Sequence, residues 1–217
     1  MSVLASQLLA ESATVAVARE DRAGGCQRRD GAAALAGLGG GVVAEATDRS
    51  GAWFGELRDG DQTVLATCEG GDTLTRVLAF ALPAVALEAE GEGAPPPLDL
   101  RALLEDYFAA LREDRFEDAA APFSPGCLYS HPPYRAGSPR ALFRGREGLL
   151  RGLIHERGSS PAIQRILRLA RAGRWGFIEG VVDGIPAGGT FLSSLRLDAD
   201  GLIDRYVACH TSPRVPL

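Results

Sequence analysis

The chain has 217 residues, of which 46% are hydrophobic and 24% are charged, and its formal net charge at pH 7 is −5. This acidic balance disfavours a nucleic-acid partner, because binding to the phosphate backbone needs clustered positive charge. No apolar run reaches the ~18 residues that a membrane span needs, so we expect no membrane partner. The N-terminal segment lacks a basic start and includes Glu11, unlike a signal peptide, and the expected location is cytoplasmic.

The cysteines and histidines give no sign of a metal or cofactor site. The four cysteines, Cys26, Cys68, Cys127 and Cys209, are far apart and include no CxxC pair. In a reducing compartment such cysteines are free thiols. The three histidines form no HxH or HExxH motif. We therefore expect no structural zinc, no catalytic metal and no cofactor.

Four apolar segments alternate with short turn signals in the first half of the chain. They cover 40–48, 52–59, 63–70 and 72–82, and the turns between them read RSG, GDQ and GGD. This pattern is typical of strands that form an antiparallel meander.

An acidic, glycine-rich stretch that ends in three prolines, LEAEGEGAPPPLD, follows at 87–99. This composition cannot pack as a helix or a strand, and it suits a linker with a stiff polyproline end. We place the linker at 91–98, between a first domain at 1–90 and a second domain at 99–217.

Helices come first in the second half. Asp99 can cap a helix whose apolar residues repeat at helical spacing, namely Leu100, Leu103, Leu104, Tyr107, Phe108 and Leu111. A short strand at 127–131 and a helix at 146–156 follow. Four further strands are predicted, at 163–170, 175–182, 190–197 and 202–211. Helices followed by an antiparallel meander indicate an α+β fold.

The two halves also resemble each other in sequence. Residues 26–38 can be aligned with 143–153, 53–60 with 175–184, and 74–83 with 202–213, in the same order in both halves. Such collinear matches indicate an internal duplication. The first match, RDG on REG, places position 131 opposite Thr14. It leaves the helix that begins at Leu100 without a counterpart, so the first copy is truncated.

The second half resembles a known family. The segments LLEDYFAALREDRFEDAAAPFSPGCLYSHPP and FRGREGLLRGL are similar to the opening of nuclear-transport-factor-2-like proteins, which include ketosteroid isomerase, SnoaL-like polyketide cyclases, scytalone dehydratase and limonene epoxide hydrolase. The resemblance covers about 99–213. It implies a cone-shaped domain in which a curved antiparallel sheet wraps around helices and leaves an apolar pocket. It also implies pairing through the sheet, so we expect a tandem of two such domains with a degenerate first copy.

The resemblance to ketosteroid isomerase suggests three catalytic residues. Tyr107 falls where the isomerase keeps its oxyanion-hole tyrosine, and His131, followed by Pro132, falls where it keeps its general-base aspartate. Ser193 falls near the second oxyanion donor, a protonated aspartic acid in the isomerase. An imidazole with its ordinary pKa near ~6.5 can take and return a proton at neutral pH. Two of the three positions differ in residue type, which weakens the case for steroid isomerisation itself.

Four further residues are candidates for binding the substrate: Tyr129, Tyr134, His210 and Trp175. His210 shares a strand face with Tyr206; that face contacts either the pocket or the other half of the chain. Arg144, Arg146, Arg151 and Arg157 surround the predicted second helix and are interpreted as a solvated face. Glu179 or Asp183 could supply the carboxylate that epoxide hydrolases of this fold use to activate water.

These observations predict a cofactor-independent enzyme of the SnoaL-like group. It would act on a small apolar carbonyl compound, polyketide-like in kind and belonging to bacterial secondary metabolism, by acid/base proton transfer in an isomerisation, dehydration or cyclisation. Two alternatives remain open, an epoxide hydrolase and a ligand-binding or assembly module without catalysis. We expect the two halves to form an intramolecular pseudo-dimer, and a further homodimer is left open.

Overall fold

The computed structural model describes residues 8–20, 26–30, 34, 38, 41–70, 73–86 and 97–215. The first half contributes strands β1 (Leu8–Glu20), β2 (Cys26–Asp30), β3 (Gly41–Thr47), β4 (Trp53–Asp59), β5 (Gln62–Gly70) and β6 (Thr73–Pro83). The expected linker at 91–98 lies almost wholly outside the described residues. Within the described part of the chain, no helix is long and apolar enough to cross a membrane.

The second half contains helices as well as strands. Its elements are α1 (Leu100–Arg112), α2 (Phe116–Ala120), β7 (Phe123–His131), β8 (Ala141–Arg144), α3 (Arg146–Gly152), a π-helical turn (Leu153–Arg157), β9 (Ile163–Ala172), β10 (Trp175–Asp183), β11 (Gly189–Leu197) and β12 (Ile203–Thr211). The expected α+β class is confirmed. The described residues of the first half contain no α-helix, as the missing counterpart of α1 implied.

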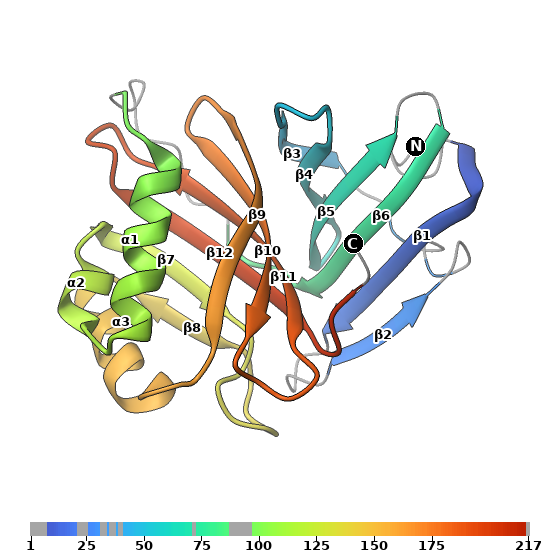
Figure 1. Cartoon of the computed structure of the whole chain (residues 1–217). Helices are drawn as coiled ribbons and strands as arrows, with labels where there is room; N and C mark the ends of the chain where they lie inside the picture. Colours follow the sequence, from blue (N-terminus) through green and yellow to red (C-terminus); the bar gives the residue numbers. More distant parts are fainter. Residues whose placement is uncertain are drawn as a thin grey trace.

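Two six-stranded sheets with the same strand order make up the molecule (Figure 1). The first has the order β2-β1-β6-β5-β4-β3, and the second has β8-β7-β12-β11-β10-β9. Each sheet is mixed rather than purely antiparallel as expected, because β1 runs parallel to β6 and β7 runs parallel to β12. Identical order and identical strand directions support the internal duplication.

Helix α1 forms where the sequence predicts it and lies across the inner face of the second sheet (Figure 1). The Asp99 carboxylate accepts hydrogen bonds from the backbone N–H groups of Arg101 and Ala102, which caps the first turn. The apolar stripe of α1 is buried and packs with side chains of the sheet in one core cluster. This helix therefore closes one side of the cone-shaped second half.

The two sheets face each other, and a second core cluster is built from both of them. Phe54 of the first sheet contacts Phe177 of the second, with ring centroids 6.5 Å apart. Leu78 and Val207, on the equivalent strands β6 and β12, are also buried in this cluster. The sheet faces that would otherwise be apolar and exposed thus cover each other.

Two buried ion pairs cross this contact in a reciprocal way. The Arg205 guanidinium donates to both carboxylate oxygens of Glu56, at 2.6 and 2.8 Å. In the opposite sense, Arg76 Nη2 donates to Glu179 Oε1 at 2.5 Å. Glu56 and Glu179 occupy equivalent places on β4 and β10, and Arg76 and Arg205 do so on β6 and β12. Such i-to-j and j-to-i contacts are those of a two-fold symmetric dimer, here within one chain.

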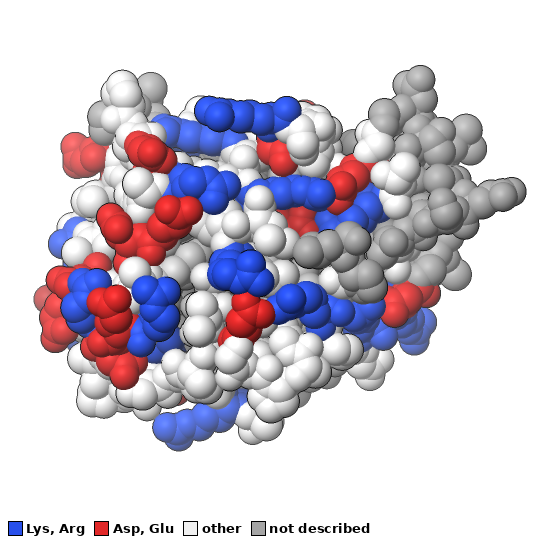
Figure 2. Space-filling model, viewed as in Figure 1, with Lys and Arg blue, Asp and Glu red and all other residues white. Residues whose placement is uncertain are grey.

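Strand β9 is an edge of the second sheet, and arginines cover it. Arg165 pairs with Asp183, and Arg168 donates to Glu69 of the first half at 2.7 Å. In Figure 2 basic and acidic side chains are interleaved over this face of the molecule. Charged side chains on an edge strand oppose pairing with a strand of another molecule.

Candidate active site

A cavity lies between α1 and the inner face of the second sheet. Its empty volume is about 750 Å³, a figure that includes the open space at its mouth. All four tyrosines of the chain line it, namely Tyr107, Tyr129, Tyr134 and Tyr206, together with two of the three histidines, His131 and His210. We call it the tyrosine cavity.

Six of the seven residues predicted for the site line the tyrosine cavity. The exception is Trp175, which lies in the cluster between the two sheets, where its ring contacts the Arg205 guanidinium at 5.6 Å. Neighbouring residues of a strand point to opposite faces of a sheet. Because β10 is buried on both faces, its hydrophobicity alone cannot tell which face Trp175 takes, and the prediction that it binds substrate finds no support in the structure.

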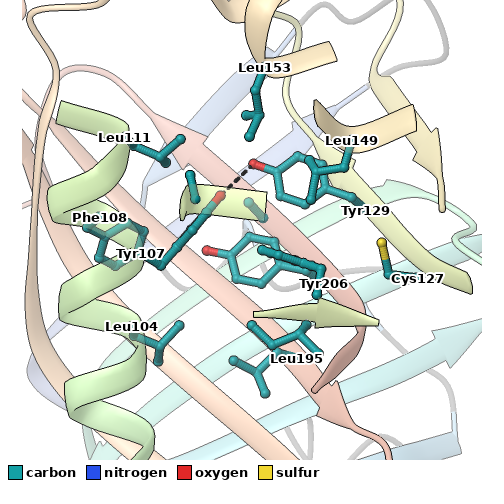
Figure 3. Packing of buried hydrophobic residues seen from close by; sticks show 14 of the residues in the cluster. Leu104, Tyr107, Phe108, Leu111, Cys127, Tyr129, Leu149, Leu153, Leu195 and Tyr206 are labelled. Carbon is teal, nitrogen blue, oxygen red and sulfur yellow. Dashed lines mark hydrogen bonds between the residues drawn. The ribbon is translucent and has the colours of Figure 1, made fainter. Parts of the chain in front are cut away.

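Three tyrosine hydroxyls form a chain of hydrogen bonds, and Figure 3 shows the first of these bonds, between Tyr107 and Tyr129. Tyr107 Oη lies 3.1 Å from Tyr129 Oη, which lies 3.3 Å from Tyr134 Oη. Burial raises the pKa of Tyr107 well above its ordinary value, and burial likewise raises the pKa of Tyr129, so both are neutral hydroxyls at ordinary pH. The three hydroxyl groups have three protons, and the two hydrogen bonds between them use two of these protons. Whatever their direction, one proton is left to donate to a bound ligand.

Ser193 supports a tyrosine rather than standing alone. The Tyr206 hydroxyl donates to Ser193 Oγ at 3.2 Å, and both side chains are buried. The Tyr206 ring is stacked on that of Tyr129 at 5.3 Å. Ser193 therefore orients Tyr206 within the cavity wall. Because it only accepts in this bond and also lines the cavity, its role as an oxyanion donor, which the resemblance implies, stays a prediction.

His131 is held between two aromatic rings, with the Tyr134 ring at 4.5 Å and the Tyr129 ring at 6.1 Å. Its Nδ1 lies 2.7 Å from the Pro132 carbonyl oxygen. Because a carbonyl can only accept, Nδ1 carries the proton and Nε2 is left as an acceptor. Burial lowers the pKa of His131 to about 3, although the Pro132 carbonyl opposes this. At neutral pH His131 is thus a neutral imidazole with one basic nitrogen.

The side chain of His210 points to the cavity and not to the other half of the chain. His210 lies on the same face of β12 as Tyr206 and lines the cavity. Burial lowers its pKa, and its Nε2 is buried without a hydrogen-bond partner. A side chain at Gly189 would begin 2.1 Å from this Nε2, so glycine is needed there to make room for the imidazole.

None of the carboxylates among the described residues lines the tyrosine cavity. Glu179 is engaged at the sheet-to-sheet contact by Arg76 and Arg168. Asp183 pairs with Arg165 and Arg214. Among the described residues, no three His, Cys, Asp or Glu side chains gather in a way that could hold a metal ion.

Sequence reasoning missed Arg157. We interpreted Arg157 as part of a solvated face, but its side chain is only 6% exposed and lines the cavity. The helix that begins at Arg146 widens into the π-helical turn before it ends, which shifts the last residues around the axis. A periodicity of 3.6 residues cannot anticipate that shift.

The first half has the same strand order as the second, but apolar residues occupy the positions that correspond to these polar groups. The shared strand order and the reciprocal ion pairs define equivalent positions. The equivalents of Tyr129, His131, Ser193, Tyr206 and His210 are, in that order, Val15, Val17, Ala66, Val77 and Ala81. All five are buried in an apolar cluster of the first half. The counterpart of His131 is thus Val17 and not Thr14, and the fold itself does not need hydroxyl or imidazole groups at these positions.

A scan against protein-family models finds no match, and a search of curated proteins finds none. Solved structures that are similar include a candidate ketosteroid isomerase from Kribbella flavida, 21% identical over 54% of this chain and 77% of that chain, with a TM-score of 0.39. A candidate polyketide cyclase from Sinorhizobium meliloti is 19% identical over 51% and 96%, with a TM-score of 0.42. An epoxide hydrolase of the LEH-like kind from M. tuberculosis is 18% identical over 51% and 80%, with a TM-score of 0.39.

Proposed function

We propose that the second half is a small-molecule enzyme that moves a proton on an apolar carbonyl compound, in an isomerisation, dehydration or cyclisation. The observation that carries the proposal is the gathering of all four tyrosines and two of three histidines around one cavity. Apolar residues at the equivalent positions of the first half form a stable core. Buried hydroxyl and imidazole groups cost free energy to desolvate, so their concentration in one copy calls for a functional reason.

His131 and the hydroxyl chain divide the chemistry between them. His131 Nε2 takes a proton from the carbon next to the carbonyl group, and the electron pair of the broken C–H bond moves onto the carbonyl oxygen. A hydroxyl of the chain formed by Tyr107, Tyr129 and Tyr134 donates to the resulting enolate oxygen. The enolate raises the proton affinity of the nearby imidazole, and the imidazolium returns the proton to another carbon.

Of the two alternatives, epoxide hydrolysis is the less favoured, because neither of the two carboxylates expected to activate water lines the cavity. Glu179 and Asp183 are bound to arginines away from the cavity. A ligand-binding module without catalysis remains the competing function, because a cavity with hydrogen-bond donors serves binding as well. The two differ in whether a bound ketone exchanges its carbon-bound protons.

That difference can be measured with two matched probes. 2-Naphthol resembles the enol of 2-tetralone, and its binding can be followed by fluorescence. Exchange of the α-protons of 2-tetralone in D₂O can be followed by NMR. We expect 2-naphthol to bind and the protein to accelerate the exchange. Binding without acceleration would leave only the binding module, and absence of both would refute the proposal.

Substitutions then test whether His131 is the base and whether Tyr107 belongs to the hydroxyl chain that donates to the enolate oxygen. His131→Gln should lower the exchange rate by about 10²–10⁴-fold, since it removes the base, while 2-naphthol still binds. Tyr107→Phe should cost roughly 1–4 kcal/mol of transition-state stabilisation, because one hydroxyl of the chain is lost while the ring still fills its place. His155→Gln removes an exposed histidine of the same half and is the matched control. Full exchange activity in His131→Gln would rule out His131 as the base.

A further inference from the structure

Several local features fix the position of the Arg157 side chain at the tyrosine cavity. It ends the π-helical turn, in which Gly158 N–H donates to the Leu153 carbonyl at 2.9 Å. Its guanidinium lies over the Phe116 ring at 5.9 Å. Asp114, whose φ of 55° is in the left-handed region that few non-glycine residues adopt, brings its carboxylate to 3.7 Å from Arg157 Nη1. Strained backbone and π-helical turns recur at functional sites.

The hydrogen-bonding capacity of this guanidinium is far from filled. An arginine has five N–H donors. The side chain donates from Nη1 to the Gly158 carbonyl at 2.8 Å, whereas Nη2 is buried and has no hydrogen-bond partner. The Asp114 carboxylate is too far for a hydrogen bond, is 39% exposed and is also engaged by Ser159. Buried donors without partners are rare in proteins and are expensive to keep.

The charge of Arg157 acts on the residues of the proposed chemistry. It lowers the pKa of Tyr129 and Tyr134, although burial outweighs this effect in both. It also contributes, after burial, to the low pKa of His131. Gln164, in the same cavity wall, has a buried side-chain oxygen without a partner. The cavity wall therefore combines one positive charge with unfilled hydrogen bonds, beside the tyrosine hydroxyls.

We propose that Arg157 binds a carboxylate of the ligand, so that the substrate is an apolar keto acid rather than a neutral ketone. This rests on the proposed function of the cavity. A planar guanidinium matches a carboxylate in geometry, and a buried pair is screened little by solvent. The carboxylate would give Nη2 its missing partner and hold one end of the substrate at this wall of the cavity.

Matched probes test this directly. 6-Hydroxy-2-naphthoic acid and its 3-hydroxy isomer are 2-naphthol with a carboxylate added at different places. At pH 7.5 we expect at least one acid to bind wild-type protein ten times more tightly than 2-naphthol, as judged by Kd from fluorescence titration. In Arg157→Gln this preference should vanish, as judged by the ratio of the Kd of each acid to the Kd of 2-naphthol for the same variant. Arg157→Lys should keep part of the preference.

Arg151→Gln is the matched control, because Arg151 lies on α3 and its side chain is 69% exposed; it should behave as wild type. If neither acid binds more tightly than 2-naphthol to wild-type protein, Arg157 does not select a carboxylate, and this comparison needs no variant. A preference that persists in Arg157→Gln also overturns the inference. Normal 2-naphthol binding and 2-tetralone exchange without an acid preference would refute the role of Arg157 alone, whereas loss of both would refute the proposed function.

Discussion

Replacing His131 with glutamine should make the stability of the protein less dependent on pH. Burial lowers the pKa of His131 to about 3 in the folded chain, against 6.5 for an ordinary histidine. Below pH 6.5 the unfolded chain binds a proton at this position while the folded chain does not. The contribution of neutral His131 is therefore complete above pH 6.5 and is lost progressively as the pH falls toward 3.

The magnitude follows from the two pKa values. Each pH unit between them is worth about 1.4 kcal/mol, so at pH 4.5 the penalty from His131 is about 2 to 3 kcal/mol. Urea unfolding at pH 7.5 and pH 4.5 measures it. Wild-type protein should lose about 2 to 3 kcal/mol more than His131→Gln between the two pH values.

The comparison rests on differences between two pH values, so a change in stability at pH 7.5 caused by the substitution itself does not affect it. Other groups that titrate in this range are common to wild type and His131→Gln. Equal losses in wild type and His131→Gln would refute the reasoning, because they would mean that His131 takes up its proton as easily in the folded chain as in the unfolded one.

Three further outcomes are expected. Glu56→Gln should lower the free energy of unfolding by about 3–5 kcal/mol, because it leaves Arg205 buried without its charge partner; a double variant with Arg205→Met should recover much of this loss, and urea unfolding measures both. Deleting 1–95 exposes the sheet face now covered by the first half, so sedimentation should show association; a monomer with an unchanged Tm would contradict this. Burial raises the pKa of Cys68 to about 12 and that of Cys127 to about 11, so at least two thiols should resist Ellman's reagent until the protein unfolds.

Helix α1 was predicted correctly because its signals lie within a short segment of the sequence. Helix α1 begins at its cap, Asp99, and its stripe places Tyr107 on the buried face, because both features depend on residues within a few positions of each other. The duplication was visible because three segments of the first half match three segments of the second half in the same order. The short strand β8 and helix α2 were missed, since neither is long enough to show a period.

The environment of the site depends on contacts between distant segments, and the sequence does not reveal it. The low pKa of His131 arises from burial among elements far apart in the chain, and its stacking on Tyr134 depends on the turn after β7. The sequence could not tell which face of β10 Trp175 takes, because a strand buried on both sides shows no alternation of apolar and polar residues. Arg157 was missed because the π-helical turn departs from the period of 3.6 residues on which the prediction of its face was based.

The reciprocal ion pairs between Glu56 and Arg205 and between Glu179 and Arg76 have a kinetic consequence. In a homodimer such contacts form by collision, so dilution separates the subunits. Here both partners belong to one chain, and their encounter is intramolecular, at an effective concentration set by the connecting segment. Assembly of the two sheets should therefore be independent of protein concentration. Because the described residues of the first copy are apolar at the positions equivalent to the tyrosine cavity, a ligand of the proposed kind should saturate at one molecule per chain, along a simple hyperbola.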